Sequence, residues 1–171
     1  MILLGDFEIR PYASSDIAAL VKHGNNAAVA RNLRDRFPHP YTRAHAIDWI
    51  RYVRAENPVR DFAIAMRMEL IGGIGVQIQD DVYRRSAEIG YWLAQPYWGR
   101  GIATRAVEAM TDYAFATYPI VRIYANVFDG NAASARVLEK VGYEFEGRLR
   151  KSVYKDGKML DQLVYAMIRE S

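Results

Sequence analysis

The sequence predicts a single-domain α+β protein, residues 1–171, built on a mixed and mostly antiparallel sheet. Runs of adjacent strand-like segments, at residues 61–78 and near the end of the chain, favour antiparallel pairing. Between these runs, a strand–helix–strand segment over residues 87–127 requires a parallel crossover. We therefore predict a twisted central sheet of six to seven strands that is flanked by helices on both faces.

The individual elements follow from apolar periodicity and from residues that cap or break regular structure. Apolar side chains two positions apart predict strands, and a spacing of three or four positions predicts helices. In chain order, we predict a strand over 7–10, a helix from about Ile17 capped by Ser14–Asp16, a short helix over 25–33, a helix capped by Thr42 and closed by Pro58, strands over 61–66, 71–78 and 87–93, a helix over 102–117, a strand over 121–127, a helix over 132–140, a strand over 141–145 and a hairpin around 155–158.

The composition is that of a water-soluble globular protein, with 51% hydrophobic and 25% charged residues. A net charge of +3 gives no reason to expect nucleic-acid binding, and no apolar run reaches the ~18 residues of a membrane span. The chain contains no cysteine, which excludes disulfides and a cysteine-linked acyl-enzyme. Its three histidines lack the spacing of metal ligands, and no signal peptide is visible, so we expect a cytoplasmic protein without a metal site.

A glycine-rich turn, Gln95–Thr104, joins the strand over 87–93 to the longest predicted helix. Gly99 and Gly101 allow positive φ angles and the close approach of another group to the backbone. The first turn of a helix has unpaired amides and a favourable dipole, so this turn suits a phosphate group. It matches neither a P-loop nor a dinucleotide-binding fingerprint, and a tight connection without any ligand is the alternative.

A second segment, Asn131–Tyr143, reads structurally as a helix with an Asn cap at its start and Gly142 at its end. Together with the glycine-rich turn, it resembles the GNAT superfamily of acetyl-CoA-dependent N-acetyltransferases. The closer similarity is to the RimJ/RimL branch, which acetylates protein N-termini or other amines. The resemblance covers nearly the whole chain, and the segments that carry it are Ile9–Pro11, Glu88–Tyr91, Tyr97–Thr104, Asn131–Tyr143 and Gly157–Asp161.

The resemblance implies a set of residues that bind acetyl-CoA. The superfamily's diphosphate pattern, Gln/Arg-x-x-Gly-x-Gly/Ala, falls on Trp98–Ala103, with Trp98 in place of the usual first residue. This departure weakens a side-chain contact there, whereas backbone contacts need only amides. In the family, the pantetheine arm pairs with the strand end at Trp92 and Leu93, and an Asn in the position of Asn131 holds the arm. The implied coenzyme-binding residues are Trp92, Leu93, Trp98, Gly99, Arg100, Gly101, Ile102, Ala103, Thr104, Asn131 and Ser134.

Acetyl transfer requires that the attacking amine lose a proton, because amines with pKa values of ~8 to ~10 are protonated at neutral pH. Alternation places Glu88 on the same strand face as Gly90 and Trp92, beside the expected thioester groove. Glu88 is therefore the candidate general base, acting directly or through a water molecule. An ion pair with Arg84, Arg85 or another basic residue is the structural alternative.

The departing thiolate needs a proton or a hydrogen bond. Many members of the superfamily use a tyrosine seven residues after the asparagine that Asn131 matches, but this position holds Leu138. Ser134 matches the serine that the RimJ/RimL branch carries three residues after its asparagine, and it is the candidate donor. A capping role at the helix start is the alternative. For the acceptor, the N-terminal helices and the final hairpin are the expected walls, with Asn32 and Tyr41 as candidate contacts.

The resulting hypothesis is an acyltransferase that moves an acetyl group from acetyl-CoA to a primary amine by direct transfer in a ternary complex. The acceptor is a protein N-terminus, ribosomal or other, or a small-molecule amine, and exposed strands or helices leave room for a homodimer. A non-catalytic acyl-CoA-binding or sensing module is the main alternative. A nucleotide-phosphate binder without acyl chemistry is a further one.

Overall fold

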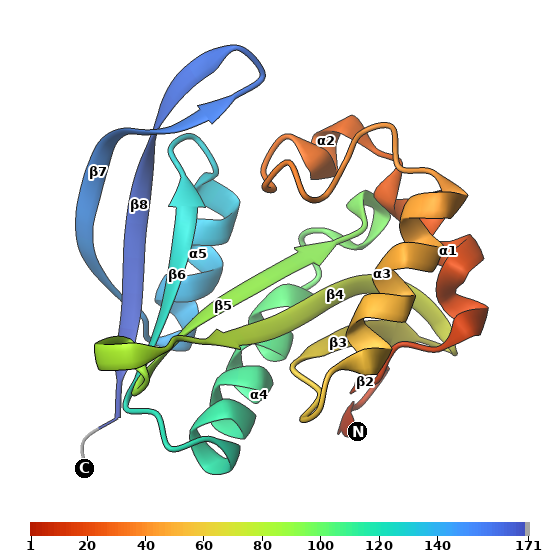
Figure 1. Cartoon of the computed structure of the whole chain (residues 1–171), viewed down its shortest axis with the longest axis horizontal. Helices are drawn as coiled ribbons and strands as arrows, with labels where there is room; N and C mark the ends of the chain where they lie inside the picture. Colours follow the sequence, from red (N-terminus) through yellow and green to blue (C-terminus); the bar gives the residue numbers. More distant parts are fainter. Residues whose placement is uncertain (170–171) are drawn as a thin grey trace. The chain divides into compact units, whose positions relative to one another are not determined.

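The computed structural model describes residues 1–169 of the chain, and Figure 1 shows the arrangement of its elements. The strands are β1 (Ile2–Leu4), β2 (Phe7–Arg10), β3 (Asp61–Met66), β4 (Glu69–Ile78), β5 (Ser86–Leu93), β6 (Arg122–Phe128), β7 (Glu144–Lys155) and β8 (Lys158–Ile168). The α-helices are α1 (Ile17–Gly24), α2 (Ala27–Ala30), α3 (Arg43–Ala55), α4 (Ile102–Thr117) and α5 (Ala132–Val141). Single 3-10 turns are formed by Ser14–Asp16, Asp81–Tyr83 and Gln95–Tyr97.

The strands form one sheet in the order β1-β2-β3-β4-β5-β6-β8-β7. The pairs β1–β2, β2–β3, β3–β4, β6–β8 and β7–β8 are antiparallel, whereas β5 and β6 are parallel. This confirms the mixed, mostly antiparallel sheet and its crossover through α4. The predicted count of six to seven strands is too low, because the described chain has eight. The strand missing from the prediction is β1, which pairs with β2 through a turn where Gly5 has a φ of 71°.

Two compact units make up the chain. The first unit contains Met1–Gly75 and Tyr91–Ala106, and the second contains Val76–Gly90 and the chain from Val107 onward. Both β4 and β5, as well as α4, continue from one unit into the other. Within residues 1–169, no helix has the length and apolar content needed to cross a membrane.

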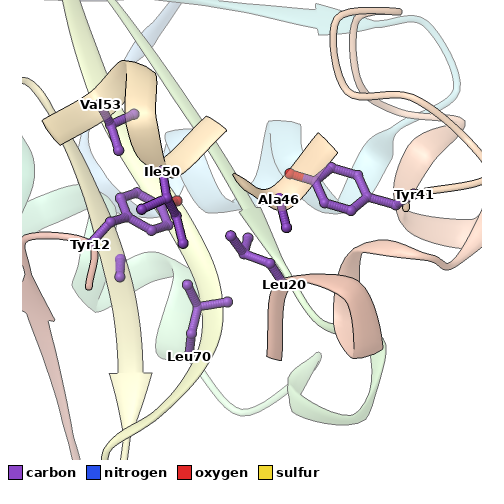
Figure 2. Close-up of a cluster of buried hydrophobic side chains, with 8 residues drawn as sticks. Tyr12, Leu20, Tyr41, Ala46, Ile50, Val53 and Leu70 are labelled. Carbon is purple, nitrogen blue, oxygen red and sulfur yellow. The ribbon is translucent and has the colours of Figure 1, made fainter. Parts of the chain in front are cut away.

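The core of the first unit packs α1 and α3 against β3 and β4. Figure 2 shows the buried side chains of this core, where the rings of Tyr12 and Tyr41 lie among aliphatic groups. The helix α3 begins as predicted, because the Thr42 hydroxyl accepts a hydrogen bond from the His45 amide at 3.3 Å. The members of this cluster are Tyr12, Leu20, Tyr41, Ala46, Ile50, Val53, Ala63 and Leu70.

The predicted capping of α1 by Ser14–Asp16 is wrong. These residues form a 3-10 turn, and the helix start has no side-chain cap. The Asp16 carboxylate is only 2% exposed and accepts two hydrogen bonds from the Arg10 guanidinium, at 2.8 and 2.7 Å. The same carboxylate also accepts from the Ala13 amide at 2.8 Å, so it holds the start of the 3-10 turn and the Arg10 side chain rather than the start of α1. The short helix predicted over 25–33 is also smaller than expected, because α2 comprises only Ala27–Ala30.

In the second unit, α4 and α5 bury apolar side chains at the three- and four-residue spacing of a helix. Met110, Ala114 and Leu138 are fully buried, and the hydroxyls of Thr111 and Tyr143 lie 2.7 Å apart in the interior. Gly142 ends α5 with a φ of 102°, so the strand predicted over 141–145 starts instead at Glu144. The predicted final hairpin is confirmed, and Figure 1 shows it as the long pair β7 and β8.

Candidate active site

The glycine-rich turn has the backbone geometry that the sequence predicts. Gly99 and Gly101 have φ angles of 74° and 73°, and a Cβ atom added at either would meet no other atom within 4 Å. Within residues 1–169, the amides of Gly101, Ile102, Ala103 and Thr104 have no protein acceptor. The turn therefore presents open backbone and unpaired N–H groups at the start of a 16-residue helix. This arrangement fits the diphosphate of a coenzyme.

The side chains beside this turn are held by the protein itself. The Trp98 indole N–H donates to the Leu93 carbonyl at 2.7 Å, which ties the turn back to the end of β5. The Arg100 guanidinium lies over the Tyr97 ring, 5.4 Å from its centroid. With its N–H engaged, Trp98 offers an aromatic surface rather than a donor, as expected from its departure from the family pattern. The Leu93 carbonyl accepts the bond from Trp98 with one of its two lone pairs.

Arg105 anchors the first turn of α4 to the N-terminal hairpin. Its guanidinium donates to the Leu4 carbonyl at 3.1 Å and to the Asp6 carboxylate at 2.9 Å, and it lies over the Phe7 ring. The start of the helix is thus fixed by three contacts within the first unit.

Trp92 and Tyr41 belong to one aromatic cluster in the first unit. Phe37 lies between them, with ring centroids 5.3 Å from Trp92 and 4.8 Å from Tyr41. Tyr41 is 4% exposed, and burial raises the pKa of its hydroxyl to about 12. Figure 2 shows its ring directed toward Ala46 in the core. The burial gives Tyr41 a packing role, and its contact with an acceptor stays a prediction, as does that of the half-buried Asn32.

Glu88 is half-buried at the end of the parallel ladder between β5 and β6, which pairs Ser86 with Arg122 and Glu88 with Tyr124. One carboxylate oxygen accepts a hydrogen bond from the Asn126 side-chain amide at 3.0 Å. The oxygen of the same Asn126 side chain accepts from the Gln162 amide, also at 3.0 Å. Glu88 therefore has a neutral amide as a partner.

Sequence reasoning missed Asn126 and Gln162. The alternation of β6 was visible and places Asn126 on the same face as Tyr124, but nothing local indicates that β8 pairs with β6. The bond from Asn126 to Glu88 depends on the pairing of β6 with β5, and the bond from Gln162 to Asn126 depends on the pairing of β8 with β6.

Asn131 and Ser134 lie at the start of α5 in the second unit. The Asn131 side chain accepts a hydrogen bond from the Ser134 amide at 3.3 Å, which confirms the predicted cap. The cap uses only the Asn131 oxygen, and within residues 1–169 its side-chain N–H groups have no acceptor. Leu138 is fully buried, so the position of the superfamily's tyrosine faces the core here.

Asp61, at the start of β3, is the titratable group with the clearest shift toward neutral pH. Burial raises the pKa of its carboxyl to about 6, helped by the nearby Glu56 and opposed by Arg36 and Arg60. Asp61 pairs with Gly75 in the β3–β4 ladder, and a Cβ atom at Gly75 would lie 2.2 Å from the Asp61 carboxylate. The glycine thus makes the space in which the carboxylate is enclosed.

We expect this carboxyl to make the protein less stable as the pH rises from about 4 to about 6. Its ordinary pKa is 3.8, so the folded state binds the proton more tightly than the unfolded state does. At pH 7 the ionised group should cost about 2 to 3 kcal/mol of unfolding free energy. Asp61→Asn should recover most of that energy at pH 7 and make the unfolding free energy less dependent on pH. Urea denaturation at pH 4.5, 6 and 7.5 measures both effects. If the unfolding free energies of wild type and Asp61→Asn changed equally with pH, the raised pKa of Asp61 would be contradicted.

Within residues 1–169, no group of three or more His, Asp or Glu side chains is arranged to hold a metal ion.

Comparison with known proteins identifies the family. A model of the acetyltransferase (GNAT) domain matches residues 6–144. The uncharacterized N-acetyltransferase YoaA of Bacillus subtilis (strain 168) is 39% identical over 101 residues, which are 59% of this chain and 56% of that protein. The putative ribosomal N-acetyltransferase YdaF of the same organism is 32% identical over 122 residues, 71% of this chain and 66% of that protein.

The chain thus spans between about half and two thirds of these two curated relatives. Among solved structures, RimJ of Mycobacterium smegmatis, in complex with CoA-disulfide, has a TM-score of 0.81 and 28% identity, and the match covers 95% of this chain and 81% of that chain. The family model includes β2 through α5, and with them Glu88, the glycine-rich turn and the α5 cap. This chain belongs to the GNAT acetyltransferase family.

Proposed function

We propose that the chain catalyses the transfer of an acetyl group from acetyl-CoA, the donor used by the GNAT family, to a primary amine. The observation that supports this most directly is the turn at Gly99–Thr104. Two open glycines with positive φ precede a helix whose first amides are unpaired. A tight connection without a ligand also uses positive-φ glycines, so the unpaired amides beside open backbone are what favour a bound anion.

In this proposal, the amides from Arg100 to Thr104 hold the diphosphate of the coenzyme. Asn131 and Ser134 contact the pantetheine arm, and the rings of Trp92 and Trp98 provide apolar surface. Leu93 would contact the arm through its backbone or its side chain, and its carbonyl keeps one lone pair beside the bond from Trp98. The thioester of the bound coenzyme supplies the activated acetyl group.

Glu88 serves as the general base in this scheme, directly or through a water molecule. The acceptor arrives as an ammonium ion at neutral pH, and the Glu88 carboxylate takes the proton that must leave before nitrogen can attack. The nitrogen then bonds to the thioester carbon, the C–S bond breaks, and the second nitrogen proton passes to the departing thiolate to give the CoA thiol. The Ser134 hydroxyl donates a hydrogen bond toward that sulfur. Since the chain has no cysteine, we propose direct transfer in a ternary complex.

The proposed acceptor is a primary amine of a protein N-terminus, and a small-molecule amine is the second candidate. YdaF carries the name of a putative ribosomal N-acetyltransferase, and this similarity places ribosomal-protein N-termini first among the acceptors to test. Such an acceptor would place the reaction in the cytoplasm. A homodimer stays a prediction.

The test is a turnover screen with acetyl-CoA against peptides with free N-termini, the same peptides with blocked N-termini, and small polyamines. We expect CoA thiol release and an acetylated product with at least one free amine, and none with the blocked peptides. Tight CoA binding without turnover on any amine would instead support the alternative of a non-catalytic acyl-CoA-binding module.

A further inference from the structure

Three polar side chains form a row across three neighbouring strands of the second unit. Glu88 lies on β5, Asn126 on β6 and Gln162 on β8, and Figure 1 shows β6 between the other two strands. Glu88 is opposite Tyr124 in the parallel ladder, and Asn126 follows Tyr124 by two residues on the same face. Asn126 is opposite Val164 in the antiparallel ladder, and Gln162 precedes Val164 by two residues. The three residues are therefore diagonal neighbours on one face.

The polarity of this row is fixed by the carboxylate. An ionised carboxylate can only accept hydrogen bonds, so Asn126 must present its Nδ2 to Glu88, at 3.0 Å. Its Oδ1 then faces β8, where it can only accept, and Gln162 must present its Nε2, at 3.0 Å. Both bonds are directed toward Glu88. Hydrogen bonds aligned in this way polarise one another and hold the last acceptor more firmly than a single bond does.

We infer that Asn126, itself oriented by Gln162, is a positioning residue that sets the direction of the Glu88 carboxylate for proton abstraction. The inference rests on the proposed function of Glu88 as the base. The Glu88 side chain loses rotamer freedom when the Asn126 amide bonds one of its carboxylate oxygens. The entropy cost of orienting the carboxylate is then already met before the amine binds.

The chemistry of amides adds a second consequence. Neither Asn126 nor Gln162 has a proton that it can pass on, so the row orients the carboxylate without sharing its proton. The proton that Glu88 accepts must leave through the product or through water. Asp in place of Asn126 would change this, because two adjacent carboxyls titrate as a coupled pair. Tyr124 is the titratable neighbour in the ladder, and Asp161 on β8 is engaged by Arg148 at 2.6 Å.

The test compares four variants in steady-state kinetics over a range of pH. Asn126→Ala should lower kcat about tenfold at unchanged KM for acetyl-CoA, because the carboxylate stays present but loses its orientation. Gln162→Ala should have a smaller effect in the same direction, about threefold. Asn126→Asp should shift the acidic limb of the kcat/KM profile to higher pH by about 1 to 2 units. Gln79→Ala removes an exposed amide that bonds the Gln77 carbonyl, and it should change none of these quantities.

The outcomes separate the positioning role from the proposed function. If Glu88→Gln keeps full turnover, Glu88 is not the base and the proposed function needs revision whatever Asn126 does. If Glu88→Gln is inactive but Asn126→Ala keeps full kcat and Asn126→Asp keeps the pH profile, the positioning role is wrong. Equal thermal unfolding midpoints of wild type and Asn126→Asp exclude loss of folding as the cause of a pH shift.

Discussion

Glu88→Gln is expected to lower kcat by about 10² to 10⁴, the range for removal of a general base. The substitution keeps the size of the side chain, and the new amide oxygen can still accept from Asn126, so the β5–β6 ladder should be undisturbed. A neutral amide cannot take a proton from the acceptor ammonium. The affinity for CoA should stay within about twofold, because the diphosphate is assigned to amides in the other unit.

The measurement is single-turnover acetyl transfer together with calorimetric CoA binding. Glu108→Gln, on the exposed side of α4, is the matched control and should be indistinguishable from wild type. An alkaline reaction buffer should partly restore the rate of Glu88→Gln, since the free amine then forms in solution without a base. A loss of CoA affinity that accounts for the whole rate defect would contradict the catalytic role.

Features that depend on neighbouring residues could be predicted from the sequence. The turn at Gly99 and Gly101, the Thr42 and Asn131 caps and the Gly142 helix end each follow from the conformational preference of one residue. Their positions fixed the start of α4 and of α5, and with them the residues proposed to hold the coenzyme. The apolar spacing over residues 102–117 likewise predicted the helix α4.

Features that depend on distant pairing could not be predicted. Asp16 was predicted to cap α1, but its carboxylate accepts from the Ala13 amide at the start of the preceding 3-10 turn and from the Arg10 guanidinium on β2. For Glu88 the sequence suggested a basic partner such as Arg84 or Arg85, whereas one of its partners is Asn126, which lies 38 positions away. Gln162 enters the same row only because β8 returns beside β6. The alternation of a strand predicts the sheet face on which a polar residue lies. Its neighbours on the adjacent strands depend on the strand order of the sheet, which the local sequence does not give.

The second large effect is expected from removing a single backbone donor at the start of α4. The carbonyl of Gly101 accepts from the Arg105 amide at 3.1 Å, so Ile102 and Ala103 are the first two residues of the helix. Proline is tolerated in a first helical turn, because its missing N–H has no partner within the helix. Ala103→Pro should therefore keep the helix but delete one N–H from the proposed diphosphate site. A hydrogen bond to a charged group contributes about 1.5 to 3 kcal/mol, so the Kd for CoA should rise about 10- to 100-fold.

Two control variants separate this donor from other effects of proline. Ala44→Pro makes the same change at the second residue of α3, where Thr42 is the cap, and it should leave the Kd for CoA unchanged. Ala103→Gly keeps the N–H while changing the side chain, and it should bind CoA within about threefold of wild type. Dephospho-CoA and CoA should be weakened equally by Ala103→Pro, since both carry the diphosphate, whereas pantetheine, which lacks it, should be unaffected. If Ala103→Pro binds CoA as tightly as Ala103→Gly does, the coenzyme is not held by this amide and the site at the start of α4 must be abandoned.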